Sequence, residues 1–388
     1  MKVITTERIP IKMWAESIED GAMEQAKNLA NMPYSYRHIA IMPDSHQGFG
    51  MPIGAVLATQ DVIVPNAVGV DINCGMNAVQ TDLKADLIDY NMVEEIMKKV
   101  ERDIPVGFAQ HKEKQESKFL EDLKNTLPED SIVNAEYEKA MYQLGTLGGG
   151  NHFIEIDKGS DGYIWLMLHS GSRGIGNKVG TFYNKMAIED NKEHYLNNVI
   201  DAELAFLPLK SEMAKRYLAE MNFCSNYADF SRYLMMHTFI NDLEEIIPEV
   251  TVLDGVSISH NFVREERHFG QWLWIHRKGA VPADGGSRGI IAGSQGTASY
   301  IVQGLGNRES FMTCSHGAGR VMGRKEAVRK LNLSEEQEKM KGIYNNMNSQ
   351  QALDEAPSCY KDIDEVMKQQ EDLAKILVKL TPLGVVKG

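Results

Sequence analysis

The segment Gly69-Val70-Asp71-Ile72-Asn73-Cys74-Gly75 sets a carboxylate and a thiol three residues apart between glycines. A thiolate with a carboxylate nearby can hold one or two divalent transition metals. This pair alone is weak support for a metal site, so the other ligands have to come from distant parts of the chain. Such ligands meet only if the whole chain folds around one centre, and this condition governs the fold that the sequence predicts.

Three separated histidines stand in settings rich in Gly, Asn or Ser. His152 follows Asn151, His169 opens a His-Ser-Gly run, and His260 precedes Asn261. Neutral imidazoles suit Mn, Fe, Co and Zn. Each candidate also has an ordinary interpretation, as a buried cysteine, a turn carboxylate or a locally hydrogen-bonded histidine. All the candidates nevertheless sit at strand ends or Gly/Asn turns, where side chains point into clefts, and this favours a shared metal site formed by Asp71, Cys74, His152, His169 and His260.

A fourth histidine, His316, lies in the run Cys314-Ser315-His316-Gly317-Ala318-Gly319-Arg320. Its small neighbours give the imidazole open approach, and a histidine nitrogen can attack phosphorus to form a phosphoramidate. A further metal ligand and a general acid are the alternatives, and the residues alone do not separate them. Two metals a few ångströms apart would suit phosphoryl chemistry, because they polarise both the attacking and the leaving oxygen. Neither the number of metals nor the native metal follows from the sequence.

The composition of the 388-residue chain is that of a globular protein, with 43% hydrophobic and 24% charged residues. It contains no run of about 18 apolar residues and no apolar signal core at its start, so we expect neither a transmembrane helix nor a secretory signal. Four cysteines, Cys74, Cys224, Cys314 and Cys359, are too few for a disulfide framework in so long a chain. These features predict a reduced, cytoplasmic setting.

The net charge is −13, from 41 basic and 54 acidic residues. This balance argues against a protein that coats nucleic acid through bulk electrostatics. It is compatible with a local basic pocket that grips one nucleic-acid end. Candidate cations are Arg277, Lys278, Arg288 and Arg320, and surface solvation is the better interpretation for Arg288.

Short apolar runs bounded by Gly, Pro and Asp predict strands in the first 80 residues, among them His38–Pro43 and Ala55–Thr59. Ile164–His169, Leu253–His260 and Gln271–Gly279 are further strands, which we interpret as carrying histidines to strand ends. No Ser- or Pro-rich linker and no repeat divides the chain. We therefore expect one compact α+β domain over residues 1–388, with central sheets, flanking helices and a central metal cleft. Helical spacing predicts helices at 19–31, 84–101, most of 176–246, 335–344 and 362–380.

Three glycine-rich segments could present backbone N–H groups to phosphate. They are Leu147–His152, His169–Gly176 and Ala292–Thr297. The second resembles a phosphate loop that opens a helix, although it lacks the Lys-Ser/Thr pair of a Walker loop and the strict dinucleotide spacing. Plain tight turns are the alternative for such runs.

Taken together, these segments closely resemble the RtcB family of GTP-dependent RNA ligases. The resemblance spans nearly the whole chain in the family's order, and chance agreement at this density is not credible. The matching segments are Met42–Gly48, Gly69–Gly75, Gly149–Glu155, His169–Gly174, Ser259–Asn261, His276–Ala280, Ser315–Arg320, Tyr360–Asp362 and Lys387–Gly388.

The resemblance implies an enzyme that uses GTP and Mn²⁺, with two metal ions in the site. Among the residues named above, it implies that Asp71, Cys74, His152, His169 and His260 are the metal ligands. His316 would be the histidine that takes GMP, with Asp44 and Arg173 in the catalytic set. A carboxylate such as Glu155 fits guanine, because it can accept from the N1–H and amino groups of the base. The implied guanosine-binding residues are Asn151, Phe153, Glu155, Asn261, Ser294, Gly317, Ala318, Gly319, Tyr360 and Lys387.

The implied reaction joins RNA ends with a 2′,3′-cyclic phosphate or 3′-phosphate to 5′-hydroxyl ends. GMP would pass from GTP to His316 and then to the RNA 3′-phosphate, and the 5′-hydroxyl would displace it. Loss of His316 or Lys387 would favour a metal-dependent phosphodiesterase that opens cyclic phosphate ends without joining them, and missing metal ligands would favour a non-catalytic RNA-binding relative; all of these residues are present. An enzyme of the same family that caps RNA ends is a further alternative. Whether the RNA is spliced tRNA or another broken RNA, and whether an activating protein takes part, does not follow from the sequence.

Overall fold

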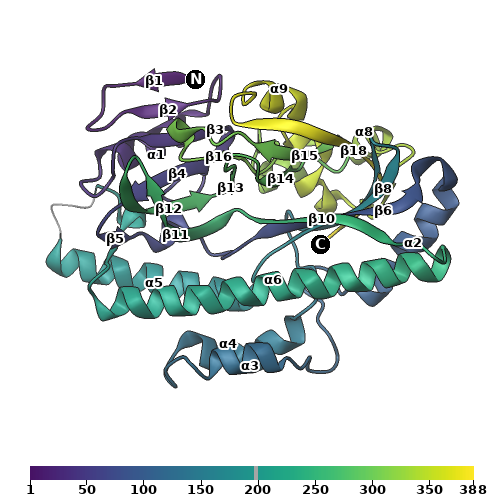
Figure 1. Ribbon diagram of the computed structural model, residues 1–388, viewed down its shortest axis with the longest axis horizontal. Helices are drawn as coiled ribbons and strands as arrows, with labels where there is room; N and C mark the ends of the chain where they lie inside the picture. Colours follow the sequence, from purple (N-terminus) through teal and green to yellow (C-terminus); the bar gives the residue numbers. More distant parts are fainter. Residues whose placement is uncertain (196–199) are drawn as a thin grey trace.

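The computed structural model describes residues 1–195 and 200–388, whose strands form two large sheets flanked by helices (Figure 1). One sheet has the order β1-β2-β3-β4-β12-β11, and the other has the order β10-β6-β8-β7-β18-β15-β14, with β17 beside β18. Neighbouring strands come from distant parts of the chain, since β4 pairs with β12 and β6 with β10. This arrangement confirms the predicted α+β fold class. The assignment of residues 1–388 to a single domain stays a prediction.

The first sheet is covered by helix α1 (Asp20–Asn31). Ala22, Ala26 and Leu29 recur along one side of α1 at helical spacing and are fully buried, which fixes the face that packs on the sheet. The strands of this sheet are β1 (Lys2–Ile4), β2 (Ile11–Met13), β3 (Ile39–His46), β4 (Ile53–Thr59), β11 (Asn261–His268) and β12 (Gln271–Lys278).

The second sheet has two central strands, β7 and β8, that are buried along most of their length. β8 is a nearly continuous apolar run, as burial on both faces requires, whereas β7 also buries Glu155 and Asp157. Its long strand β18 pairs with both β15 and β7, and a register shift near Pro382 accommodates the proline. The strands are β6 (Gly75–Lys84), β7 (Phe153–Gly159), β8 (Tyr163–Ser170), β10 (Val252–Ser259), β14 (Arg288–Ile291), β15 (Ser299–Gly304), β17 (Tyr344–Asn345) and β18 (Ala374–Lys387).

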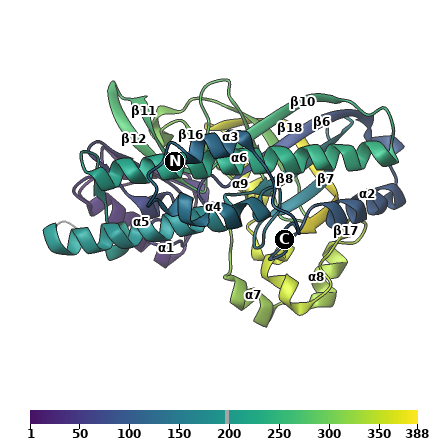
Figure 2. The same cartoon turned by 90° about the horizontal axis from the view of Figure 1, so that it is seen from below.

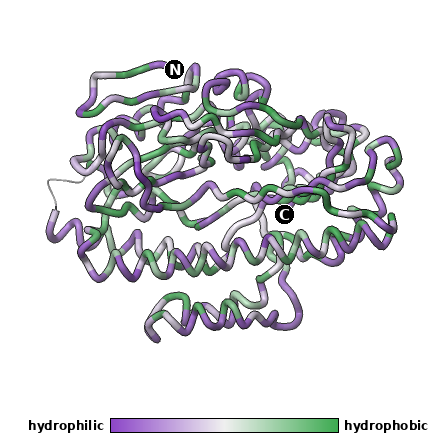
Figure 3. Tube along the Cα trace, viewed as in Figure 1, coloured by the Kyte–Doolittle hydropathy of each residue, from purple (hydrophilic) through white to green (hydrophobic). Residues whose placement is uncertain are grey.

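Two long helices, α5 (Arg173–His194) and α6 (Glu212–Ile246), run along one side of the sheets, and α3 and α4 lie beyond them (Figures 1 and 2). Hydrophobic and hydrophilic stretches alternate along α6, as expected for a helix with a buried and an exposed side (Figure 3). The remaining helices are α2 (Tyr90–Asp103), α3 (Lys118–Lys124), α4 (Ile132–Gln143), α7 (Arg324–Lys330), α8 (Leu333–Lys339) and α9 (Ile363–Lys368).

Short elements complete the described structure. The paired strands β5 (Val62–Ile63) and β9 (Leu207–Pro208) form one small sheet, and β13 (Ala280–Pro282) and β16 (Thr313–Ser315) form another. Short 3-10 helices lie at Pro65–Ala67, Ala85–Leu87, Ala202–Leu204, Arg308–Ser310, Gln350–Glu355 and Pro357–Cys359. Among the described residues, no helix is both long and apolar enough to cross a lipid bilayer.

The largest hydrophobic cluster joins the two sheets. It contains Met42 and Ile275 from the first sheet and Met76, Met167 and Ile301 from the second. Since burial of apolar surface stabilises a fold at about 25 cal/mol per Å², this cluster fixes how the sheets face each other. A second cluster packs α4, α5 and α6 together, so the helical layer is joined by its own core.

The register of three neighbouring strands brings their ends to one place. Gly75 at the start of β6 lies opposite Ser170 at the end of β8 and opposite Ser259 at the end of β10. Because antiparallel neighbours run in opposite directions, the start of β6 meets the ends of both partners. Residues next to these three positions are therefore forced together.

Several predicted elements need correction. Residues 362–380 do not form one helix, because α9 ends at Lys368 and β18 begins at Ala374. The mixed spacing of charged and apolar residues there fits either period, and pairing with β7 and β15 decides for the strand. The helix predicted at 335–344 ends at Lys339, and the one predicted from residue 84 starts at Tyr90. The prediction that most of 176–246 is helical is confirmed by the two separate helices α5 and α6, and residues 196–199 lie outside the described residues.

We predict that Gly75→Ala destabilises the protein by about 1–3 kcal/mol, as overpacking does in a tightly packed core. A Cβ at Gly75 would lie 2.1 Å from the Ile258 carbonyl oxygen, so β6 and β10 would have to separate. Chemical denaturation measures the change. Gly255→Ala in β10 is the control, since its Cβ meets nothing closer than 3.5 Å. Equal stability of the two variants would contradict the prediction.

Candidate metal centre and nucleotide site

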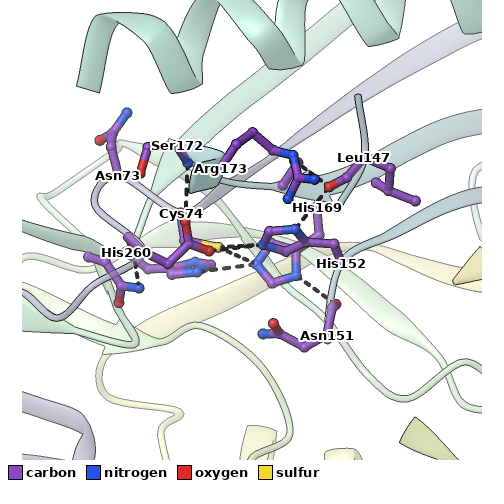
Figure 4. Close-up of polar contacts among 12 residues, drawn as sticks. Asn73, Cys74, Leu147, Asn151, His152, His169, Ser172, Arg173 and His260 are labelled. Atoms are coloured by element: carbon purple, nitrogen blue, oxygen red, sulfur yellow. Dashed lines mark hydrogen bonds and ion pairs between the residues drawn. The ribbon is translucent and has the colours of Figure 1, made fainter. Parts of the chain in front are cut away.

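Five predicted ligands converge where β6, β8 and β10 meet (Figure 4). The Cys74 Sγ atom lies 3.1 Å from His169 Nε2 and 3.5 Å from His152 Nε2. His169 Nε2 lies 3.2 Å from His260 Nε2, and His152 Nε2 lies 2.9 Å from Asp71 Oδ2. Segments separated by up to about 190 residues thus place sulfur, oxygen and nitrogen donors within one small volume.

These donors form two groups that share one residue. Cys74, His169 and His260 make one group, and Asp71, Cys74 and His152 make the other. Within each group the donor atoms lie within 4.8 Å of one another. A thiolate can bridge two cations, so the arrangement is compatible with a metal site and suits a pair of ions.

Backbone carbonyls orient two of the imidazoles. His152 Nδ1 donates to the Leu147 carbonyl at 2.9 Å, and His169 Nδ1 donates to the Asn151 carbonyl at 3.1 Å. Each Nδ1 therefore carries a proton and is held by a carbonyl, so each Nε2 faces the donor cluster. Since Nε2 is then the nitrogen left to bind a cation, this orientation fits the metal ions that the sequence predicts.

The turn that carries Asp71 and Cys74 is held from three sides. Asn73 takes a left-handed conformation, with φ of 56°, which asparagine tolerates better than most residues. Its N–H donates to the Asn261 carbonyl at 2.7 Å, and the N–H of Cys74 donates to the Asp71 carbonyl. The N–H of Ser172 donates to Asp71 Oδ1 at 3.1 Å. The ligands are thus positioned by backbone hydrogen bonds before any cation binds.

Burial sets the protonation states of the cluster. It lowers the pKa of His169 and of His260 well below the usual value, with help from the neighbouring histidines, so both rings are neutral. Burial opposes ionisation of Asp71, yet the hydrogen bond and charge of His152 lower its pKa to about 2. Burial and the Asp71 carboxylate raise the pKa of Cys74 well above its usual value, so the thiol keeps its proton until a cation binds.

His316 adjoins the cluster and is paired with a buried carboxylate. Its ring centroid lies 4.8 Å from that of His260. Asp44, fully buried in β3, accepts from His316 Nδ1 at 2.7 Å, from the His316 N–H at 3.1 Å and from the Gly317 N–H at 3.3 Å. Lys361 donates to the carbonyls of Pro43 and Ser45 on either side of Asp44. Since Nδ1 faces Asp44, Nε2 is the ring nitrogen of His316 that points away from this carboxylate.

A group of cations surrounds one buried carboxylate beside the glycine-rich segment Leu147–His152. Glu355 lies 3.0 Å from Arg320 Nη1, 2.9 Å from Arg324 Nε and 3.8 Å from Lys387 Nζ, and it accepts from the Tyr360 hydroxyl. Burial opposes ionisation of Glu355, but these three cations lower its pKa. Three positive charges face the carboxylates of Glu355 and Asp354, and the remaining positive charge suits a phosphate-bearing ligand.

The other predicted nucleotide residues are divided between this group and the surroundings of Asp71 and Asp44. Lys387 Nζ donates to the Asn151 carbonyl and lies 5.3 Å from the Phe153 ring centroid. Asn261 donates to the Asp71 carbonyl and accepts from the Gly279 N–H. It therefore links the metal turn, the turn that carries Asp71 and Cys74, to the residue that follows β12. Ser294 is buried and meets Thr297. Gly319 approaches Asp44 too closely for any Cβ, and Ala318 is buried beside it.

Arg173 opens α5 and reaches the glycine run. Its guanidinium donates to Thr146 Oγ1 at 3.2 Å and to the Gly107 carbonyl at 3.3 Å, and a Cβ on Gly148 would collide with it. The predicted cations Arg277 and Lys278 lie elsewhere. Arg277 is buried and paired with Glu266, and Lys278 donates to the carbonyls of Phe49 and Asn66.

Sequence reasoning missed Glu355, Arg324 and Asp157. Glu355 follows Asp354 in a short acidic run, a pattern typical of a solvated surface. Asp157 shares a face of β7 with Glu155, two residues along the strand. That spacing is the one signal that could have revealed the acidic pair.

The chain matches a known family over most of its length. Residues 25–388 match the family model described as tRNA-splicing ligase RtcB. The chain is 38% identical to RNA-splicing ligase RtcB of Escherichia coli (strain K12), over 100% of this chain and 99% of that protein. It is 32% identical to tRNA-splicing ligase RtcB of Pyrobaculum aerophilum, over 98% of this chain and 95% of that protein, and 28% identical to its namesake in Thermococcus kodakarensis, with the same coverage.

These matches define the class as an enzyme, a nucleic-acid ligase. The chain belongs to the RtcB family. Both the resemblance and the expectation of an enzyme are thereby confirmed.

We predict that cation binding at neutral pH releases about one proton, from the Cys74 thiol, because the bound form is the thiolate. Calorimetric titration of the metal-free protein with Mn²⁺, in buffers of different ionisation enthalpy, measures this proton. Cys74→Ala should abolish the release and lose metal at one or both positions. Cys224→Ala, which removes a buried thiol from α6 outside the cluster, should bind as the wild type does. Unchanged stoichiometry in Cys74→Ala would remove Cys74 from the site.

We also predict that stability falls as the pH rises through neutrality because of Asp157. Burial raises the pKa of Asp157 to about 7, and burial together with Asp157 raises that of Glu155. A carboxyl whose pKa is raised on folding stabilises the fold below its unfolded pKa, and this stabilisation is lost as the pH passes the folded pKa. The loss should be on the order of 2 kcal/mol between about pH 5.5 and pH 7.

Denaturant unfolding at several pH values tests this behaviour. Asp157→Asn, which cannot ionise, should flatten the fall. Asp86→Asn, at an exposed carboxylate, should leave the profile of the wild type. A profile that is equally steep in Asp157→Asn would show that other groups cause the fall.

Proposed function

We propose that the protein joins RNA ends bearing a 2′,3′-cyclic phosphate or 3′-phosphate to 5′-hydroxyl RNA ends, with GTP as co-substrate and Mn²⁺ as the metal. One observation carries the proposal: His316 stands between a buried carboxylate and the metal cluster. The ligase names of its relatives supply the substrate class. Four free, buried cysteines support the reduced, cytoplasmic setting predicted from the sequence.

His316 is the group that accepts GMP in this proposal. Asp44 holds Nδ1, orients the ring and stabilises the positive charge that the ring gains during attack. Nε2 forms a bond to the α-phosphorus of GTP while the bond from that phosphorus to its bridging oxygen breaks and pyrophosphate leaves. The two backbone N–H groups that share Asp44 fix the carboxylate, so the pair stays aligned through the step.

The guanylyl group then moves to RNA. An oxygen of the RNA 3′-phosphate bonds to the guanylyl phosphorus as the bond to His316 breaks, which leaves an RNA-ppG end. The 5′-hydroxyl oxygen then bonds to the RNA 3′-phosphorus, and GMP departs with the anhydride oxygen. A 2′,3′-cyclic phosphate is first hydrolysed to the 3′-phosphate.

The proposed metal residues are Asp71, Cys74, His152, His169 and His260. Cations held there would neutralise phosphate charge and polarise the reacting oxygens. The protein supplies imidazoles whose Nδ1 atoms are held by backbone carbonyls, and a thiol and a carboxylate at the centre. Arg173 adds a half-buried positive charge beside the glycine-rich segment Leu147–His152.

The nucleotide is proposed to lie along the glycine run and the cations around Glu355. Lys387, Arg320 and Arg324 carry more positive charge than Glu355 and Asp354 together compensate, which favours a polyphosphate. One carboxyl oxygen of Glu155 has no protein partner among the described residues, and the donors of guanine could satisfy it. Asn151, Phe153, Asn261, Ser294, Gly317, Ala318, Gly319 and Tyr360 complete the proposed guanosine site.

Incubation with α-³²P-labelled GTP and Mn²⁺ should label the protein covalently, and His316→Ala should abolish the label. Asp44→Asn should slow labelling by about 100-fold or more, since it loses the charge that supports the imidazole. His237→Ala, at an exposed histidine of α6, is the control. Equal labelling of His316→Ala and the wild type would refute the assignment.

Joining assays with defined RNA ends separate the proposal from its alternatives. The proposal predicts sealed strands from a 3′-phosphate end, a 5′-hydroxyl end, GTP and Mn²⁺. Labelled protein that leaves RNA-ppG ends unsealed would indicate end capping. Opening of cyclic phosphate without labelling would indicate a hydrolase, and neither activity would indicate an RNA-binding relative or the need for an activating protein.

A further inference from the structure

Helix α6 carries an arginine that is wholly buried against the sheet. The side chain of Arg232 is 0% exposed. Its Nη1 donates to the carbonyl of Asn73 at 2.8 Å and to the carbonyl of Ser170 at 3.0 Å. Its Nη2 donates to Ser259 Oγ at 3.3 Å and to Asp229. One guanidinium thus contacts three segments that are far apart in the sequence.

The three accepting residues have one property in common. Asn73 precedes Cys74, Ser170 follows His169, and Ser259 precedes His260 in the sequence. Each hydrogen bond therefore acts on the residue next to a proposed ligand. The three ligands reached in this way are the ones that form one of the two donor groups, Cys74, His169 and His260.

Neighbouring residues complete this support. Asp229 accepts from Arg232 and also from Asn73 Nδ2, at 2.9 Å, so it fixes both the arginine and the metal turn. Asn73 Nδ2 also donates to the Ser225 carbonyl at 3.0 Å. A Cβ on Gly75 would lie 3.1 Å from the Arg232 Cζ atom, so the glycine leaves room for the guanidinium.

Stability alone gives a poor reason for this arginine. Burying a guanidinium costs free energy unless all its donors are paired, and apolar replacements of buried ion pairs are often neutral or stabilising. Arg232 Nε has no partner among the described residues, so the pairing is incomplete. A planar, rigid fork of donors is, however, well suited to holding several backbone groups at fixed separations.

We propose that Arg232 is a positioning residue, which sets the spacing of Cys74, His169 and His260 for cation binding by holding the chain beside each of them. This inference rests on the metal centre of the proposed function. Groups that orient metal ligands typically change metal affinity by about 10- to 100-fold when they are removed. Arg232→Met, which keeps the length of the side chain but not its donors, should show a loss of this size.

The test uses Co²⁺ as the probe and the full-length, metal-free protein. Cobalt bound to a thiolate gives a charge-transfer absorption, so titration reports both affinity and the Cys74 contact. Arg232→Met should bind Co²⁺ about 10- to 100-fold more weakly, with a shifted or weakened band, and Arg232→Lys should recover part of the loss. Arg216→Met is the control, because Arg216 lies on the same helix but pairs with Asp130 at the surface.

Asp229→Ala keeps the inference testable if Arg232→Met does not fold. Asp229 is 57% exposed, so the fold should tolerate this change, and Co²⁺ binding should weaken several-fold. Wild-type affinity and an unchanged band in Arg232→Met, even with a lower unfolding midpoint, would show a structural role only and overturn the proposal. Wild-type binding by Asp229→Ala would overturn it in the same way. Wild-type protein without the band would instead refute the metal centre itself.

Discussion

The structure depends on bringing one sulfur atom and three imidazole nitrogens together at the meeting point of β6, β8 and β10. These groups come from segments that local interactions cannot join, so the strand register has to bring them together. Packing between the two sheets supplies the free energy that holds the register. Backbone carbonyls then accept from Nδ1 of His152 and of His169, so the backbone orients these two rings toward the donor cluster.

The site has two parts with different electrostatic characters. The first part is the donor cluster, which contains the neutral imidazoles of His169 and His260 and the protonated thiol of Cys74. Its thiol can lose a proton when a cation binds. The second part gathers Arg320, Arg324 and Lys387 around Glu355. His316 adjoins the first part through His260, and Asp44 holds it from β3 of the first sheet. The two sheets therefore each contribute to the proposed transfer step.

Sequence alone predicted the short-range features well. Local patterns predict the turn at Asp71–Cys74 and the strand ends at His169 and His260. They also predict a helix at 19–31, which α1 confirms. Long-range pairing determined what the sequence missed. β18 has a pattern that fits a helix until β7 and β15 pair with it, and Glu355 has the pattern of a surface acid until three cations from other segments meet it. Arg232 gave no signal, because its partners are backbone carbonyls.

We propose that divalent cations bind on both sides of the Cys74 sulfur. Anomalous diffraction from a crystal soaked in Mn²⁺ would locate them. We expect two peaks that share Cys74 Sγ, one beside His169 and His260 and the other beside Asp71 and His152. Manganese bound elsewhere, with Cys74 outside the coordination sphere of every ion, would contradict it.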